Sequence, residues 1–172
     1  MRSSSASCAP FRVALLASLT AALVSCAGAA GSAPPAPVAP GPPDGPEQAC
    51  LELAGARRAR GQNEPDTIVA RHILVKYAGS KRAEDSVTRS RGAACLRALE
   101  ARDKARVGTS FEDLVKEYSD EAGAASRGGT VGSIERTDVV PPFANAAFEL
   151  DVQQVSDVVE TDFGFHVILR TE

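Results

Sequence analysis

The sequence predicts an α+β domain in which helices surround a small, mainly antiparallel sheet of four strands. An apolar run with strand character covers Ile68–Tyr77, and two more close the chain at Val155–Thr161 and Phe165–Thr171. Three helical patterns and a short strand lie between the first run and the last two. The resulting order, β-α-α-β-α-β-β, suits one domain with helices packed around a sheet.

The first predicted strand, Ile68–Tyr77, is apolar on both faces, which is typical of a central strand. Side chains alternate between the two faces with a period of two. His72, Leu74 and Lys76 therefore share one face, and the odd-numbered residues share the other. The only other histidine, His166, lies in the last predicted strand.

Two helices are predicted after this strand. Ala93–Arg106 is rich in Ala and Leu, and Gly108 beyond it is a common helix stop. Ser110 and Asp113 resemble a capping box at the start of the next helix. Apolar residues at helical spacing predict that this helix faces a core through Phe111, Leu114, Val115 and Tyr118.

The second half of the domain begins with the glycine-rich segment Arg127–Gly132, whose glycines permit tight turns. It is not a nucleotide-binding loop, because no strand precedes it and no long helix follows. A short strand is predicted near Thr130–Ile134. Pro141 and Pro142 then start a short helix, since proline suits the first helical turn.

The chain has 172 residues, a formal net charge of −3 and no Trp. This balance argues against a nucleic-acid-binding protein, because little would neutralise a run of phosphates. Residues 27–46 are almost entirely Ala, Pro, Gly and Ser, which is typical of a tether. We expect a signal peptide at 1–25, a tether at 26–66 that includes a short helix at Glu47–Arg60, and the folded domain at 67–172.

The N-terminus is typical of an export signal, with a positive segment before the apolar run Val13–Val24. Leu23-Val24-Ser25-Cys26 resembles the lipobox of bacterial lipoproteins. That resemblance implies acyl chains on Cys26 and a membrane anchor facing the periplasm or cell exterior, on the outer membrane if the cell is Gram-negative. Ordinary cleavage at Ala27–Ala29 would instead give a soluble exported protein.

Cys50 and Cys95 lie beyond this leader. An oxidising compartment permits a disulfide between them. Cys95 also lies among apolar residues of a predicted helix, where a free buried cysteine is equally consistent. The sequence leaves both states open.

Several motifs occur in a fixed order between residue 68 and the end of the chain. They are the strand around His72, Tyr118-Ser119-Asp120-Glu121, Arg127–Gly132, Pro142-Phe143 with Ala147–Leu150, and Phe163–Leu169 around His166. In this order they resemble the parvulin family of peptidyl-prolyl cis/trans isomerases. The resemblance implies the parvulin fold and rotation about the bond before proline, a reaction that demands no cofactor, metal or covalent nucleophile.

The resemblance also implies a site. Its hydrogen-bonded centre comprises His72, Glu121, Thr161 and His166, and its apolar pocket for the proline ring comprises Val131, Ile134, Val139 and Phe143. Parvulins usually carry Cys or Asp where this chain has Glu121, so the carboxylate here is one methylene longer. Without such context, two strand histidines are more often structural than catalytic. The spacing of His and Cys does not indicate a zinc site.

Lys76, Lys81 and Arg82 resemble in their spacing the basic cluster of the phosphoserine/threonine-proline-directed parvulins. Three cations beside the pocket would favour a phosphate or a carboxylate just before the proline. The loop is a few residues shorter than in those enzymes, and exported bacterial proteins seldom meet phosphorylated clients. We therefore favour an acidic residue at that position.

The sequence thus predicts an exported peptidyl-prolyl isomerase that acts on proline-containing polypeptide clients, as a monomer and without nucleic acid. The alternative is a non-catalytic module of the same fold that binds peptides as a chaperone. Glu121 keeps this alternative open, because its longer side chain alters the usual geometry.

Overall fold

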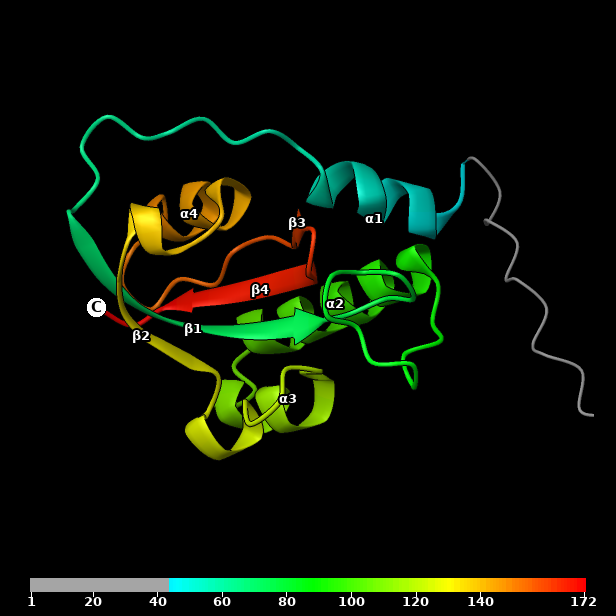
Figure 1. Ribbon diagram of the computed structural model, residues 1–172. Coiled ribbons are helices and arrows are strands. Elements are labelled where there is room, and N and C mark those ends of the chain that lie inside the picture. The colour runs from blue at the N-terminus through cyan, green and yellow to red at the C-terminus, as the bar shows by residue number, and fades with distance from the viewer. Residues whose placement is uncertain (1–43) are drawn as a thin grey trace, which may run out of the picture. The chain divides into compact units, whose positions relative to one another are not determined.

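An antiparallel sheet of four strands organises residues 44–172, the part of the chain that the computed structural model describes (Figure 1). The strands are β1 (Thr67–Val75), β2 (Thr130–Glu135), β3 (Val159–Thr161) and β4 (Gly164–Arg170), in the spatial order β2-β1-β4-β3. The predicted signal peptide, Cys26 and the first part of the predicted tether lie outside the described residues.

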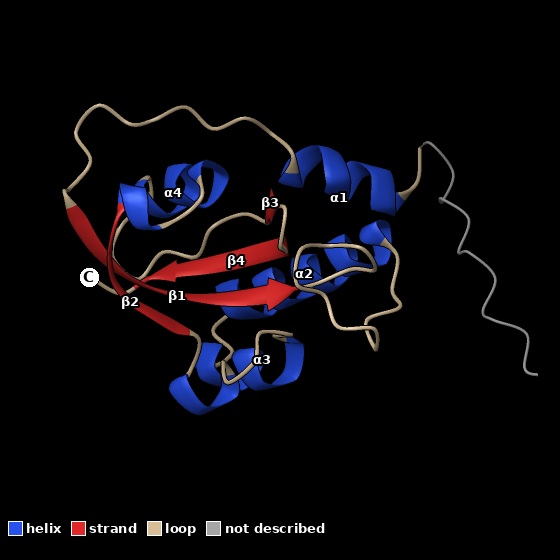
Figure 2. Ribbon diagram, viewed as in Figure 1, coloured by secondary structure: helices blue, strands red, loops and turns tan. Residues whose placement is uncertain are grey.

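Helices cover both faces of the sheet (Figure 2). The helices α2 (Arg91–Arg106) and α3 (Phe111–Tyr118) lie on one face, and α4 (Pro141–Phe148) lies on the other. Ile73 and the other odd-numbered apolar residues late in β1 join the core under α2 and α3, whereas Ile68 joins the core under α4. Within residues 44–172, no helix is long and apolar enough to cross a membrane.

The predicted α+β architecture is confirmed, but the third predicted strand is shorter than Val155–Thr161. Only an isolated bridge joins Val155 to Leu169. Next to it, the Ser156 hydroxyl accepts the Ile168 N–H at 2.9 Å. A side-chain oxygen that takes the place of a strand carbonyl interrupts the regular ladder, so pairing resumes only at Val159.

A fourth helix, α1 (Pro46–Ala54), precedes the sheet and is shorter than the predicted Glu47–Arg60. It ends at Gly55, whose N–H bonds to the Leu51 carbonyl at 2.9 Å. The following residues 55–66, which we call the link, pass over α4 before entering β1 (Figure 1).

Covalent and polar contacts hold α1 and the link against the domain. Cys50 on α1 and Cys95 on α2 form a buried disulfide, which settles the question that the sequence left open. In the link, the Arg58 carbonyl accepts from the Asn145 amide of α4 at 2.8 Å, and the Arg58 guanidinium pairs with Glu149 at 3.0 Å. The helix and the link therefore pack as part of the folded unit.

We expect the double replacement Cys50→Ala/Cys95→Ala to lower the free energy of unfolding by about 4 kcal/mol, because the cross-link spans 45 residues and restricts the unfolded chain. Urea denaturation would measure the change. Reduction of the natural protein by dithiothreitol is the control and should lower the midpoint similarly. An unchanged midpoint in both would contradict a stabilising disulfide.

Candidate active site

Three polar residues lie diagonally across three neighbouring strands. Leu74 of β1 stands opposite His166 of β4, so His72 is one diagonal step from His166. Thr161 of β3 stands opposite Gly164 of β4, so Thr161 is one diagonal step from His166, on the side away from β1. Residues two apart on a strand share a face, and diagonal neighbours lie within reach of long side chains. The register of the sheet therefore gathers the three on the α4 face.

Hydrogen bonds join these residues into a chain. Thr161 Oγ1 accepts the Phe163 N–H at 3.1 Å and forms a hydrogen bond with His166 Nε2 at 2.8 Å. Nδ1 of His166 and Nδ1 of His72 share a hydrogen bond at 3.2 Å. His72 donates from Nε2 to Oε2 of Glu121 at 2.9 Å. Because a carboxylate can only accept, the hydrogen-bonded chain ends on Glu121, and the roles of the ring nitrogens follow from the tautomers assigned to them.

The surroundings of the chain set the charge of His166 and of Glu121. Burial lowers the pKa of His166 well below its usual range, and His72 beside it lowers that pKa further. The hydrogen bond from His72 lowers the pKa of Glu121 against the opposing effect of burial, and Arg127 lowers it as well. The Arg127 guanidinium lies 2.6 Å from the same carboxylate oxygen. At neutral pH the site therefore contains a neutral His166 and an ionised Glu121.

The turn that carries Glu121 is held on β1. The Asp120 N–H donates to the Leu74 carbonyl at 2.7 Å, and the Asp120 carboxylate accepts the Lys76 N–H at 2.8 Å. The same carboxylate pairs with Arg89. These contacts fix the backbone next to Glu121 relative to the strand that carries His72.

The glycine-rich loop approaches the other side of His72. The Gly129 carbonyl accepts the His72 N–H at 2.8 Å. Gly129 has a φ of +73°, and a Cβ there would lie 2.5 Å from the His72 carbonyl oxygen. Only glycine permits this contact, so the predicted role of the loop as a tight turn is confirmed.

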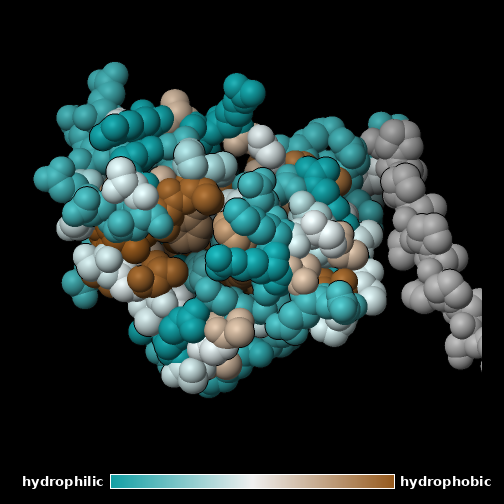
Figure 3. All heavy atoms as spheres, in the orientation of Figure 1, coloured by the Kyte–Doolittle hydropathy of each residue, from teal (hydrophilic) through white to brown (hydrophobic). Residues whose placement is uncertain are grey.

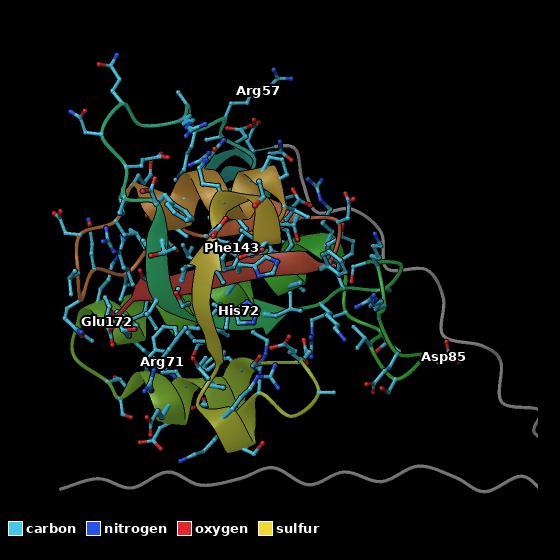
Figure 4. All side chains as sticks on the ribbon, turned by 60° about the vertical axis from the view of Figure 1, so that its left-hand side comes forward. Arg57, Arg71, His72, Asp85, Phe143 and Glu172 are labelled. Carbon is cyan, nitrogen blue, oxygen red and sulfur yellow. A yellow bond between two sulfur atoms is a disulfide. The ribbon has the colours of Figure 1, made fainter. Side chains whose placement is uncertain are left out.

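The apolar part of the site centres on Phe143 of α4. Its ring lies edge-on to both imidazoles, with centroid distances of 5.7 Å to His72 and 5.3 Å to His166. Figure 4 shows Phe143 above His72, on the α4 side of the sheet. The remaining predicted pocket residues pack in the same cluster, buried at Ile134 and half-buried at Val131 and Val139. On the face in Figure 3, the largest group of hydrophobic side chains lies on the left among hydrophilic ones, and smaller groups lie farther right.

The basic residues of the loop after β1 divide into two environments. Lys81 and Arg82 are exposed beside Phe163, with their cationic groups 5.0 and 5.8 Å from the ring centroid. Lys76 is buried, and its ammonium donates to the Arg82 carbonyl at 3.0 Å. Lys81 and Arg82 therefore face solvent, whereas Lys76 holds the backbone of the loop that carries them.

Two residues at the site have contacts that the sequence did not reveal. The sequence places Arg127 in the glycine-rich segment and Phe163 in the motif around His166, and assigns neither of them a contact at the site. Phe163 joins the basic loop to Thr161 through its ring and its N–H. The available signal for Arg127 was a cation in the same short loop as Glu121. Within residues 44–172, no group of three or more His, Cys, Asp or Glu is arranged to hold a metal ion.

An apolar cluster packed against hydrogen-bonded imidazoles suits an enzyme that turns a peptide bond without cleaving it. The family described as the PPIC-type PPIase domain matches residues 56–172. The chain therefore belongs to the parvulin-type peptidyl-prolyl cis/trans isomerases, as the sequence predicts.

Individual relatives agree with this membership. The chain is 38% identical over 122 residues to the putative peptidyl-prolyl cis-trans isomerase dodo of Drosophila melanogaster, covering 68% of this chain and 73% of that protein. It is 43% identical over 110 residues to the foldase protein PrsA of Geobacillus kaustophilus, covering 64% of this chain but 33% of PrsA. The solved structure of the isomerase ESS1 from Candida albicans has a TM-score of 0.59 at 28% identity, covering 64% of this chain and 65% of ESS1.

The neutral state of His166 predicts how stability depends on pH. The unfolded chain binds a proton near the usual pKa of 6.5, whereas the folded chain does not, because burial lowers the pKa of His166. The unfolded state then holds more protons, so the free energy of unfolding falls as the pH drops below 6.5. The slope approaches about 1.4 kcal/mol per pH unit.

His166→Gln should flatten this slope between pH 6.5 and pH 5. Urea denaturation at several pH values would measure it, with each protein compared with its own stability at pH 8. Equal slopes for the natural protein and the variant would show that His166 takes up its proton in the folded state.

Proposed function

We propose that this protein catalyses rotation of Xaa-Pro bonds in polypeptides outside the cytoplasm. The site is formed by Phe143 and by the hydrogen-bonded side chains of Thr161, His166, His72 and Glu121. The observation that carries this proposal is the Phe143 ring, set edge-on against two hydrogen-bonded imidazoles. Such a pocket offers an apolar surface to a pyrrolidine ring and no unpaired imidazolium beside it. Val131, Ile134 and Val139 extend the same surface.

The barrier to this rotation is about 18–20 kcal/mol, because amide resonance gives the C–N bond partial double-bond character. An acceleration of about 10⁵ would require the enzyme to lower this barrier by about 7 kcal/mol. Resonance places negative charge on the carbonyl oxygen, so a desolvated, apolar site disfavours it and favours the twisted state. The imidazoles need not transfer a proton. Their role in this proposal is to hold the walls of the pocket in one arrangement.

Glu121 contributes a fixed negative charge to this arrangement. A carboxylate near the substrate carbonyl opposes the build-up of charge on that oxygen, and so weakens resonance. Arg127 and His72 both bind the same carboxylate oxygen, which fixes its position despite the extra methylene. This support favours catalysis over the non-catalytic alternative.

An extracytoplasmic location is supported by two independent features. The Cys50–Cys95 disulfide is of a kind that forms and persists in oxidising compartments. The sequence Leu23–Cys26 resembles a lipobox, and we propose that Cys26 carries the lipid that anchors the mature chain to a bacterial membrane. The similarity to proteins named foldases suggests proteins in the course of folding as clients.

The exposed pair Lys81 and Arg82 supports a preference for an acidic residue, or a phosphorylated one, just before the proline. Phe163 orders both cations and also bonds to Thr161 at the centre of the site. In this proposal the two cations contact the residue just before the proline.

Exchange NMR on a Glu-Pro peptide tests the activity. Phe143→Ala would remove a core side chain, since Phe143 is 3% exposed, and such truncations cost about 3–5 kcal/mol of stability. Phe143→Leu is the cleaner variant and should lower the exchange rate at least tenfold. Phe148→Leu is its control, because Phe148 lies on the same helix and in the same cluster. Equal losses of exchange rate in both variants would show that Phe143 has no specific role in the site.

The double variant Lys81→Ala/Arg82→Ala should reduce kcat/KM for Glu-Pro relative to Ala-Pro peptides by about fivefold, because exposed charge pairs contribute up to about 1 kcal/mol each. Added salt should reduce the preference of the natural protein in the same way. Lys116→Ala on α3 is the control. An unchanged ratio would exclude these cations from substrate selection.

A further inference from the structure

A cavity of about 570 Å³ lies between the link, β3 and the start of α4, outside the pocket described above. Ligand-binding pockets in proteins typically measure about 300–1,000 Å³. One wall is formed by residues 54–58, and Figure 4 shows Arg57 on this segment above α4. The other walls are formed by Tyr77, by residues 140–142 with Asn145, and by residues 159–162.

The cavity exists because the N-terminal extension is held firmly. The Cys50–Cys95 disulfide fixes α1, and the Arg58 backbone and side chain bind Asn145 and Glu149. Farther along the link, Glu64 pairs with Arg136 at 2.5 Å in a buried position. Without these contacts the wall at residues 54–58 would be absent.

The cavity shares two structural elements with the active site. Thr161 lines it, and the same residue bonds through its side chain to His166 Nε2. Pro142 lines it, and Phe143 is the next residue of α4. A polypeptide bound with its proline against Phe143 would therefore have this cavity beside its flanking residues.

The lining suits an extended peptide more than a charged small molecule. Its apolar surface comes from Val140, Pro141 and Val159, with the ring of Tyr77. The buried part of its charge is already paired, because Glu160 accepts two hydrogen bonds from Arg91 and Arg58 pairs with Glu149.

All three residues of β3 line the cavity, and β3 is an edge strand that pairs only with β4 within residues 44–172. A free strand edge can accept an extended chain through backbone hydrogen bonds, with pockets for alternate side chains. The geometry points to a second substrate-binding site, in which an extended segment flanking the target proline lies along β3 and places an apolar side chain in the cavity. This inference rests on the proposed isomerase function and adds a subsite to it.

The test compares short and long substrates of the full-length protein in mild detergent. Exchange NMR would follow a four-residue Glu-Pro peptide and versions extended by six residues with Leu and Val, at the N-terminal or the C-terminal end. We expect extension at one end to lower KM about tenfold, as burial of one apolar side chain implies. The rate at saturation should stay the same.

Val140→Asp should abolish this gain and leave turnover of the short peptide within twofold. Val140 is the exposed N-cap residue of α4, where Asp is favoured, so the helix is retained. Val152→Asp, at another exposed valine, is the matched control and should keep the gain. Ala56→Trp fills the cavity from the link side and should act like Val140→Asp.

A gain that survives both cavity variants, or no gain from extension at either end, would overturn the subsite. Failure of the isomerase proposal is distinguishable, because the short peptide would then show no turnover in any variant. In that case binding of the long peptide, followed by chemical shifts of Ala56 and Val159, would still decide whether the cavity accepts a chain.

Discussion

The antiparallel pairing of β1 with β4 is the constraint on which the rest of the structure depends. Its register places Leu74 opposite His166 and so sets His72 and His166 one diagonal step apart. The same register directs one set of side chains into the core under α2 and α3 and the other set toward α4. A slip of one residue would turn every side chain to the opposite face, and would destroy both cores and the site together.

Much of this arrangement follows from local patterns. The alternation in Ile68–Tyr77 predicts which residues of β1 share a face with His72, and the helical spacing from Phe111 to Tyr118 predicts the buried side of α3. Both depend only on short-range periodicity. The family resemblance supplies what periodicity cannot, namely that residues as distant in sequence as Glu121 and Thr161 belong to one site.

Other features depend on contacts between distant segments, and a single sequence does not reveal them. The short third strand results from the Ser156 hydroxyl reaching Ile168 on β4. The pairing of Cys50 with Cys95 depends on how α1 packs on α2, and the cavity depends on the path of the link. The ion pair of Arg127 with Glu121 explains how a longer carboxylate is accommodated, but closeness of the two residues in the sequence does not by itself predict that they pair.

The attachment of α1 has a consequence for the range of the enzyme. In the anchored form proposed above, 20 residues separate Cys26 from the start of α1 at Pro46, where the part packed on the domain begins. A stretch of 20 residues spans at most about 70 Å even when fully drawn out. The anchored domain would therefore stay within this distance of the lipid headgroups, where newly translocated chains emerge.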